Sequence, residues 1–363
     1  MNTTQIRQPL RQNFALRLVA WQKQHGRHAL PWQGSASGDA YSVWLSEIML
    51  QQTQVETVIS YYQRFLTRFP DLKSLAAADQ DAVLGHWSGL GYYSRARNLH
   101  AAARQIVDQH GGRFPRHIDA ILALPGIGRS TAAAISAFAF GERRAILDGN
   151  VKRVLTRVFG IEGWPGEKAV ETRLWQLSEA LMAETLLPSA DIQAYTQGLM
   201  DLGATVCKRG RPQCESCPFS DDCIANLQGR QRELPASRPR KSVPERSTGM
   251  LVLLNAGEVL LEKRPNSGIW GGLWSLPEFA ESENPLAAAQ RLGFQTALPG
   301  ELPGELPAFN HTFTHFRLLI QPWQLRVKRV LSAAEPGRLW LSLDELEGAA
   351  LPTPVRRILA GLR

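Results

Sequence analysis

The sequence predicts two domains: an all-helical domain, followed by a smaller domain that combines helices and strands. First, 363 residues with 44% hydrophobic content are long for one compact domain and apolar enough to form cores. Second, apolar residues recur with helical spacing over about residues 10–206. Third, short apolar runs between turn residues replace this pattern after about Ser247. We therefore expect a helical domain over residues 1–228, a linker over 229–247 and the mixed domain over 248–363.

The formal net charge of the chain is +8. An excess of Lys and Arg favours a polyanionic partner, although many basic proteins bind no nucleic acid. No apolar run reaches the roughly 18–20 residues that cross a bilayer. The first residues also lack the apolar segment and small-residue cleavage site of an export signal. The sequence therefore predicts a cytoplasmic protein without a membrane partner.

The helical region consists of apolar periodic stretches between Gly and Pro residues. The clearest stretches are Val43–Leu50, Val55–Phe65, Leu99–Val107, Thr131–Phe140 and Val170–Met182. Glu47 lies at the edge of the apolar face of the first stretch. An acid in apolar surroundings has a raised pKa and keeps its proton. The alternative is an ordinary solvated helix residue.

Residues Ile118–Phe140 predict two helices joined by a tight turn that contains Gly126 and Gly128. Two glycines separated by one residue let the backbone turn sharply and approach a ligand. The N–H groups at the start of the next helix then favour an anion such as a DNA phosphate. A plain connection between packed helices is the alternative.

Asp148 stands where an apolar run gives way to the predicted helix VKRVLTRVF. At a helix N-terminus a carboxylate is stabilised by free N–H groups, so we expect Asp148 to be ionised. The alternative is an ordinary N-cap. Cleavage of a glycosidic bond needs a proton donor for the leaving group and an anion near the cationic sugar. A neutral Glu47 and an ionised Asp148 would form such a pair.

All four cysteines lie in one short segment with the spacing C-x6-C-x2-C-x5-C: Cys207, Cys214, Cys217 and Cys223. Four thiolates this close in sequence can converge on a zinc ion or on an iron–sulfur cluster. Disulfides fit poorly, because stabilising disulfides in a long chain would not cluster in this way.

The residues after the cysteines form a basic, proline-containing stretch with few apolar residues, which predicts the linker. GMLVLLNAGEVLLEKRP (249–265) then predicts a β-hairpin with an Asn-Ala-Gly turn. Further strands are expected at Leu318–Val327 and Leu339–Leu341, and helices at Leu286–Leu292 and Pro354–Leu362.

Five motifs together resemble bacterial adenine DNA glycosylases of the helix-hairpin-helix, endonuclease III superfamily. They are WLSEIMLQQTQV, GLGYYSRARNLH, LPGIGRSTAAAI, LDGNVKRVL and MDLGATVCKRGRPQCESCPFSDDC. The resemblance implies a helix-hairpin-helix glycosylase domain whose cysteine loop holds a 4Fe–4S cluster. It implies hydrolytic removal of adenine paired with 8-oxoguanine or guanine in duplex DNA. Glu47 would protonate adenine N7, and Asp148 would stabilise the cationic sugar.

The resemblance also implies residues that bind the DNA. Asn150 would hold the flipped nucleotide, Trp32 and Gln197 would line the adenine pocket, and Gln52, Thr53 and Tyr92 would contact the lesion strand. Leu90 and Tyr92, next to a flexible Gly91, suit side chains that fill a vacated base stack, whereas Tyr93 is expected in the core.

Ser130 stands where the endonuclease III branch has a lysine nucleophile, which implies a glycosylase that leaves an abasic site intact. Lys152 is near enough in sequence to contact DNA.

The second domain resembles the Nudix-like domain that reads 8-oxoguanine, through GIWGGLWSLPEF and FNHTFTHF. Its stretch ENPLAAAQRLGF lacks the glutamates of a working Nudix hydrolase, so pyrophosphohydrolysis is not expected. Phe313, Thr314 and His315 occupy the lesion-reading loop, where Thr314 replaces the usual serine. A metal site at His311 and His315 is the alternative.

Three functions from different classes remain open once the resemblance is taken into account. The first is the adenine glycosylase, acting as a monomer. The second is a bifunctional pyrimidine-lesion lyase, against which Ser130 and the second domain count. The third is a non-catalytic DNA-binding module, against which the pair of Glu47 and Asp148 counts.

Overall fold

The computed structural model describes residues 8–33, 39–184, 187–239, 243–328 and 336–362. The chain divides into two units. The first comprises Met1–Ala76 and Ala101–Arg240, and the second comprises Ala77–His100 and Lys241–Arg363. The division near residue 240 falls inside the expected linker, whose basic residues Arg240 and Lys241 lie outside the described residues. The inclusion of Ala77–His100 in the second unit was not predicted. Within the described residues, no helix is both long and apolar enough to span a bilayer.

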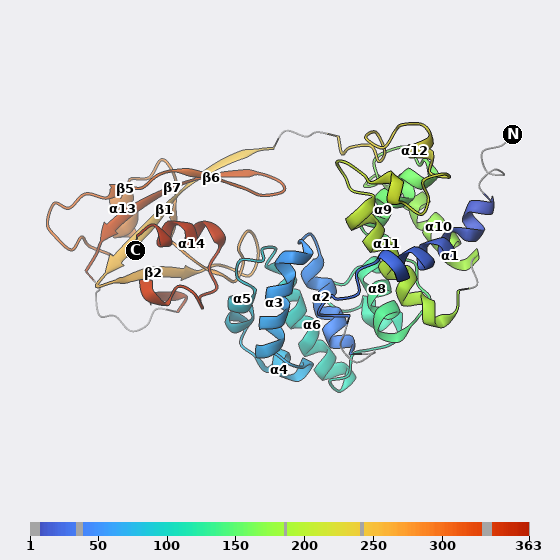
Figure 1. The fold of residues 1–363 in the computed structure, drawn as a ribbon. Coiled ribbons are helices and arrows are strands. Elements are labelled where there is room, and N and C mark those ends of the chain that lie inside the picture. The colour runs from blue at the N-terminus through green and yellow to red at the C-terminus, as the bar shows by residue number, and fades with distance from the viewer. Residues whose placement is uncertain (1–7, 34–38, 185–186, 240–242, 329–335, 363) are drawn as a thin grey trace. The chain divides into compact units, whose positions relative to one another are not determined.

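The first unit is helical, as predicted (Figure 1). Its helices are α1 (Gln8–His25), α2 (Ala40–Leu50), α3 (Val55–Arg68), α4 (Leu72–Ala77), α7 (Ile118–Leu122), α8 (Arg129–Phe140), α9 (Gly149–Phe159), α10 (Lys168–Glu184), α11 (Ile192–Asp201) and α12 (Ile224–Leu227), with α4 ending at the unit boundary. Helix α6 (Ser94–His110) contains the second boundary, at His100. The predicted pair of helices around Gly126 and Gly128 is present as α7 and α8.

The core of the first unit lies among α1, α8, α9, α10 and α11. Phe14 of α1 is fully buried and stacks on Phe219 of the cysteine segment, with ring centroids 4.4 Å apart. Helix α11 continues into a π-helical turn, Leu202–Val206, that ends at Cys207. The cysteine segment is thus anchored in the hydrophobic core at its first cysteine and again at Phe219.

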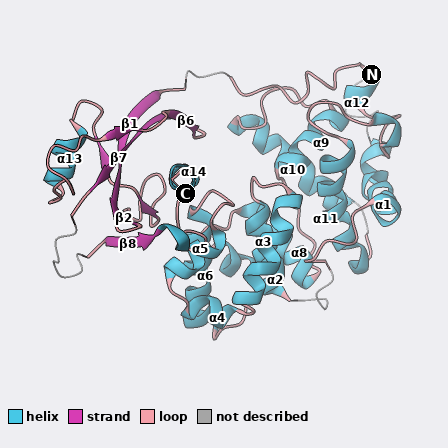
Figure 2. Cartoon of the chain, turned by 60° about the vertical axis from the view of Figure 1, so that its left-hand side comes forward, coloured by secondary structure: helices cyan, strands magenta, loops and turns pink. Residues whose placement is uncertain are grey.

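The second unit contains a mixed sheet, which Figure 2 shows with its strands side by side. Its strands are β1 (Glu245–Asn255), β2 (Glu258–Lys263), β3 (Trp274–Ser275), β4 (Glu278–Phe279), β5 (Gly304–Glu305), β6 (Phe309–Thr312), β7 (Arg317–Arg326) and β8 (Arg338–Ser342). The sheet follows the path β3-β2-β1-β7-β5, with β1 and β7 parallel and β1 and β2 antiparallel. Off this path, β8 pairs with β2, β4 with β1 and β6 with β7. Leu251, Leu253 and Leu260 of β1 and β2 are buried in its core.

The secondary structure expected for the second domain is confirmed. Strands β1 and β2 form the predicted hairpin, and Ala256 and Gly257 in its turn have φ values of +46° and +83°. Strands β7 and β8 match the other two expected strands. Helices α13 (Pro285–Arg291) and α14 (Thr353–Ala360) match the expected helices. In addition, α5 (Gln80–Trp87) and the start of α6 belong to this unit, although they precede the sheet by some 150 residues of chain.

Candidate functional site

A cavity of about 1240 Å³ opens in the first unit between the end of α2, the helical hairpin, the start of α9 and the segment after the cysteines. Segments distant in sequence therefore meet at one site. Of the residues singled out in the sequence, the cavity lining includes Glu47, Gln52, Thr53, Gly128, Ser130, Asp148, Asn150 and Lys152. Basic side chains also line it: Arg27, Arg153, Arg157, Lys208, Arg209, Arg232 and Arg238.

Glu47 lies in the last two turns of α2, a helix whose other residues from Ala40 to Met49 are buried. Glu47 as a whole is partly exposed and lines the cavity. Burial, followed by repulsion from Asp148, raises the pKa of Glu47 from 4.5 to about 8. The expected proton donor is therefore neutral at pH 7.

Asp148 caps the N-terminus of α9. Its Oδ1 accepts a hydrogen bond of 2.7 Å from the backbone N–H of Val151. The sequence predicts an ionised Asp148 at this helix N-terminus. Burial raises the pKa of Asp148 above 3.8, despite the hydrogen bonds from Val151 and Asn150 and the nearby charge of Arg153. Desolvation outweighs the hydrogen bonds of the helix N-terminus here because Asp148 is half-buried in the cavity wall.

Arg153 was not singled out in the sequence. It lies one turn beyond Asn150 on α9. Its Nη2 donates hydrogen bonds of 2.8 Å to Asn150 Oδ1 and to the Gly203 carbonyl, and its Nε donates one of 2.7 Å to the Cys207 carbonyl. Asn150 in turn donates to Asp148 Oδ2 at 3.4 Å. One helix thus connects the candidate site to the first cysteine. The only sequence signal is the spacing of Asn150, Arg153 and Arg157 on one helix face.

The hairpin turn has the backbone that its glycines predict. Gly126 has a φ of +79°, which favours glycine, and Gly128 is the N-cap of α8. A Cβ at Gly128 would meet no atom within 4 Å, so its environment is open. Ser130 Oγ accepts a hydrogen bond of 2.9 Å from the Leu147 N–H, which ties α8 to the extended segment before Asp148.

The polar residues after α2 line the same cavity. Gln52 is exposed and has a φ of +57°, a left-handed conformation that non-glycine residues adopt rarely. Gln51 Nε2 donates to Thr131 Oγ1 of α8 at 3.3 Å. Lys152, which also lines the cavity, forms an ion pair of 2.6 Å with Glu171.

Two residues expected to wall an adenine pocket are not part of the cavity lining. Trp32 is buried and packs edge-on against Tyr62, with ring centroids 5.4 Å apart. Gln197 is buried and donates a hydrogen bond of 2.8 Å to Asp201, which also binds Arg27 at 2.7 Å. Gln197 therefore reaches the cavity through Arg27, which does line it.

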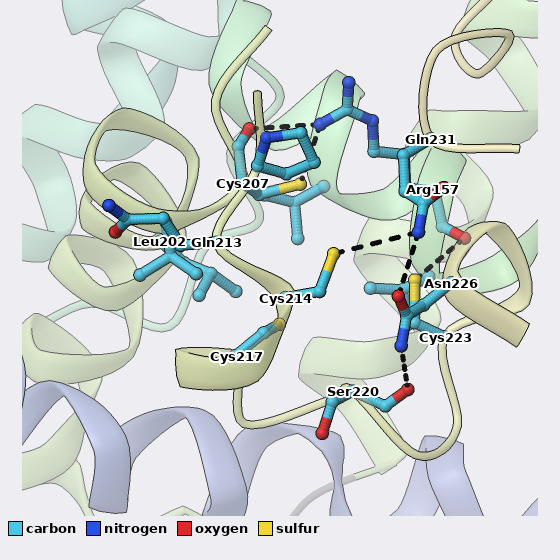
Figure 3. Close-up of a pocket in the computed structure, with 14 residues that line it drawn as sticks. Arg157, Leu202, Cys207, Gln213, Cys214, Cys217, Ser220, Cys223, Asn226 and Gln231 are labelled. Carbon is cyan, nitrogen blue, oxygen red and sulfur yellow. Dashed lines mark hydrogen bonds between the residues drawn. The ribbon is translucent and has the colours of Figure 1, made fainter. Parts of the chain in front are cut away.

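The four cysteines line one small pocket of their own, shown in Figure 3. Arg157 Nη1 approaches Cys207 Sγ at 3.4 Å, and Gln231 Nε2 approaches Cys214 Sγ at 4.0 Å. Burial, together with the neighbouring thiols, raises the pKa of Cys217 to about 12. All four cysteines are free thiols. Four thiols that line one pocket, two of them near side-chain N–H donors, are suited to a cationic centre, which would favour their ionised form.

No group of three or more His, Cys, Asp or Glu side chains in the described ranges is arranged as a metal site as it stands. His311 and His315 belong to no such group of three or more. Their rings instead contact Phe313, with centroids 4.7 and 6.2 Å away.

In the second unit, Tyr92 is 45% exposed and has a φ of +48°, after Gly91 at +76°. Leu90 and Tyr93 are buried, which confirms the expected core position of Tyr93. Phe313, Thr314 and His315 form a tight turn between β6 and β7, closed by a hydrogen bond of 2.9 Å from the Phe313 N–H to the Phe316 carbonyl. The Thr314 and His315 side chains are exposed.

Comparison with known proteins agrees with this architecture. Residues 45–180 match the family described as HhH-GPD superfamily base excision DNA repair protein, and residues 249–361 match the NUDIX domain family. A thermostable thymine-DNA glycosylase is 28% identical, with a TM-score of 0.53, over 61% of this chain and 98% of that protein. Endonuclease III in a DNA complex, at 21% identity and a TM-score of 0.51, covers 64% of this chain and all of that one, and shows the fold alone.

The helical fold and the match of residues 45–180 place the first unit in the HhH-GPD superfamily of base excision DNA repair proteins. Two curated relatives narrow this class. The adenine DNA glycosylase of Buchnera aphidicola (strain APS) is 34% identical over 96% of this chain and 97% of its own length. The human adenine DNA glycosylase is 35% identical over 94% of this chain and 72% of its own. The chain belongs to the adenine DNA glycosylase family.

Proposed function

We propose that this protein hydrolyses the N-glycosidic bond of adenine paired with 8-oxoguanine or guanine in duplex DNA and leaves an abasic site. The observation that carries the proposal is the pair of carboxyl groups in one cavity, with the pKa of Glu47 raised to about 8. A flipped adenine in this cavity would meet a carboxyl group that is neutral at pH 7. Such an acid can protonate N7 and so turn adenine into a good leaving group.

Asp148 takes the second role. As the glycosidic bond breaks, positive charge develops on the sugar, and a nearby carboxylate stabilises it. Protonation of Glu47 removes the repulsion between the two groups, so Asp148 can ionise while Glu47 stays neutral. The N–H of Val151 and the amide of Asn150 then hold the Asp148 carboxylate toward the cavity.

Ser130 supports a hydrolytic reaction without strand cleavage. A lyase needs an amine that forms a Schiff base with the sugar. Ser130 has no amine, and its hydroxyl is already bonded to the Leu147 N–H. Lys152, which lines the cavity, is held in an ion pair with Glu171. We assign Lys152 to DNA contact.

DNA would bind across the hairpin and the basic wall of the cavity. The N–H groups after Gly128, at the start of α8, suit a phosphate, and Lys208, Arg209, Arg232 and Arg238 add positive charge. Gln52, Thr53 and Tyr92 would enter the duplex beside the 8-oxoguanine. Phe313, Thr314 and His315 would read the lesion.

We further propose that the protein acts as a monomer on the nucleoid, with domain boundaries at residues 228 and 247.

We propose that Cys207, Cys214, Cys217 and Cys223 hold a 4Fe–4S cluster. Their shared pocket and the N–H groups near two of the sulfurs support this assignment. When bound, the cluster would supply structural cross-linking of the loop rather than a redox step. Iron and sulfide analysis with the visible absorption spectrum tests the assignment, because colourless protein that contains zinc would overturn it.

The function is tested with two duplexes, one with adenine opposite 8-oxoguanine and one with an oxidised pyrimidine, each incubated with and without alkali. Cleavage of the first duplex only after alkali supports the proposal. Cleavage of the second duplex without alkali would instead identify a pyrimidine-lesion lyase. No cleavage of either duplex, with DNA binding retained, would identify a binding module.

A further inference from the structure

Tyr92, whose ring is exposed, lies in a loop that is held in place by hydrogen bonds from neighbouring residues. Trp87 Nε1 donates to the Gly91 carbonyl at 3.1 Å, and Arg95 Nη2 approaches the carbonyls of Leu90 and Gly91 at 3.4 and 3.3 Å. The guanidinium group of Arg95 also lies over the rings of Trp87 and Tyr92, 5.4 Å from each centroid. A non-glycine residue with a φ of +48° costs energy, and it persists only where its surroundings over-determine it.

The same loop is fastened to the C-terminal part of the chain at the Leu351 carbonyl. The hydroxyl groups of Ser88 and Tyr93 both donate to this oxygen, each at 3.2 Å. Tyr93 OH also accepts a bond of 3.3 Å from the Gly89 N–H, and Arg356 Nε of α14 donates to Ser88 Oγ at 3.0 Å. The residues on both sides of Leu90–Tyr92 are therefore held by residues some 260 positions later. We name these contacts of Ser88 and Tyr93 with Leu351 the Leu351 clasp.

A second attachment leads toward the lesion-reading turn. Arg97 Nη1 donates a hydrogen bond of 2.5 Å to the Gly271 carbonyl. The preceding residue, Trp270, has a φ of +54° and packs against the rings of His311 and Phe313, with centroids 5.8 and 5.5 Å away. Loop 264–273 thus contacts both the segment that carries Tyr92 and the turn that carries Phe313.

Helix α5 also packs closely against the C-terminal part of the second unit. A Cβ on Gly85 would lie 2.8 Å from the Gly348 carbonyl, and Asp81 of α5 accepts a hydrogen bond of 3.1 Å from Trp274 Nε1 and pairs with Lys263. Segment Ala77–His100 is therefore built into the second unit rather than resting on it.

We propose that the C-terminal fold positions Tyr92: the Leu351 clasp and the Arg97–Gly271 bond hold the strained loop so that the exposed ring enters DNA in register with the lesion-reading turn. Ser88, Tyr93 and Arg97 are positioning residues that act through Tyr92. The inference rests on the proposed function, because it concerns how the 8-oxoguanine strand is engaged. It adds a specific task for the C-terminal fold beyond reading the lesion.

The test removes only the two clasp hydroxyl groups, in the double variant Ser88→Ala/Tyr93→Phe of the full chain. The matched control, Ser60→Ala/Thr67→Val, removes two exposed hydroxyl groups of α3, which within the described part of the chain bond to carbonyls of their own helix. Each protein is compared in single-turnover adenine release from adenine:8-oxoguanine duplex. The fluorescence of 2-aminopurine placed beside the 8-oxoguanine reports the unstacking that ring entry causes. Both variants are made again in a Tyr92→Ala background.

We expect the clasp variant to release adenine roughly 5–20-fold more slowly and to give a smaller fluorescence rise. The two hydroxyl groups donate to the Leu351 carbonyl and accept from the Gly89 N–H and Arg356 Nε, and all of these hydrogen bonds are lost. In the Tyr92→Ala background the clasp variant should add less than about 2-fold, because residues that act through one another are not additive. Arg97→Met should behave like the clasp variant, with Arg97→Lys restoring part of the rate. The control should match wild type.

Equal rates and fluorescence for the clasp variant and the control would overturn the inference. So would an undiminished effect in the Tyr92→Ala background, because the clasp would then act by general destabilisation. Failure of the proposed function is a separate result: wild-type protein would release no adenine, while the fluorescence comparison would still report whether the clasp governs entry of Tyr92.

Discussion

Replacing Glu47 by glutamine separates the chemical role of this residue from its effect on stability. Glutamine has nearly the same shape but cannot donate an acidic proton, so adenine release should be lost while DNA binding is kept. The free energy of unfolding, in contrast, should increase. A carboxyl group whose pKa is raised by burial makes the folded state less stable wherever the unfolded chain would ionise it.

The size of this effect follows from the pKa. Raising it from 4.5 to about 8 corresponds to about 5 kcal/mol at pH values above 8, at about 1.36 kcal/mol for each pKa unit. The same linkage gives about 3 kcal/mol at pH 7 and less than about 1 kcal/mol at pH 5. These are ceilings, because Glu47 is partly exposed and lines the cavity. The glutamine side chain does not titrate, so the Glu47→Gln variant should be more stable by about 1–3 kcal/mol at pH 7.

Thermal unfolding of wild type and Glu47→Gln at pH 5, 6, 7 and 8, at one heating rate, measures this gain. The difference in Tm should grow with pH, reaching roughly 2–8 °C at pH 8. Glu56→Gln, which changes an exposed glutamate on α3, is the matched control and should show little pH-dependent gain.

Two results would refute the reasoning. A Tm difference that is flat from pH 5 to pH 8 would show that Glu47 is not held neutral by the fold. Adenine release by the Glu47→Gln variant at near-normal single-turnover rates would show that Glu47 is not the proton donor.

Three further predictions follow from the site. In wild type, kcat/KM for adenine release should fall above pH 8 as Glu47 of the free enzyme ionises. It should also fall at acid pH as Asp148, whose pKa is raised above 3.8, becomes protonated. A pH-independent profile from pH 5 to 9 would contradict the roles of Glu47 and Asp148 as acid and carboxylate. Thr314→Ala should lower the preference for 8-oxoguanine over guanine by about 3–10-fold, measured as the ratio of single-turnover rates. The substitution removes one exposed hydroxyl group, while the backbone hydrogen bond still closes the turn. An unchanged ratio would show that Thr314 does not read the lesion. Arg153→Met should lower both the release rate and the Tm, at a cost of about 2–4 kcal/mol in the free energy of unfolding, because three buried or half-buried oxygens lose their donor. Arg153→Lys should only partly restore the rate and the Tm, since an ammonium group lacks the guanidinium fork. A variant indistinguishable from wild type would show that the link to Cys207 is dispensable.

Local features of the sequence predicted much of the fold. The two glycines of the hairpin turn, the apolar periodicity of α2 and the Asn-Ala-Gly turn between β1 and β2 each depend on a few neighbouring residues. The apolar neighbours of Glu47 also predicted correctly that its pKa would be raised, because the buried positions of α2 around it determine most of its surroundings.

Predictions that depend on contacts between segments distant in the sequence were less complete. The N-cap position of Asp148 was readable, but its raised pKa was not, because burial by other segments outweighs the bonds from its own helix. Trp32 and Gln197 were expected at the cavity and are instead buried beside Tyr62 and Asp201. Arg153 was overlooked, since its partners Gly203 and Cys207 lie some 50 residues away.

The sequence by itself determined the helical hairpin, the clustering of four cysteines and the presence of two carboxyl groups suited to glycosidic cleavage. These depend on residue type and short spacing, which the chain carries whatever its final fold. Only the tertiary structure decided that both carboxyl groups share one cavity and that Ala77–His100 joins the C-terminal unit. The physical reason is that desolvation and long-range hydrogen bonds depend on which distant segments pack together, and no local pattern encodes those partners.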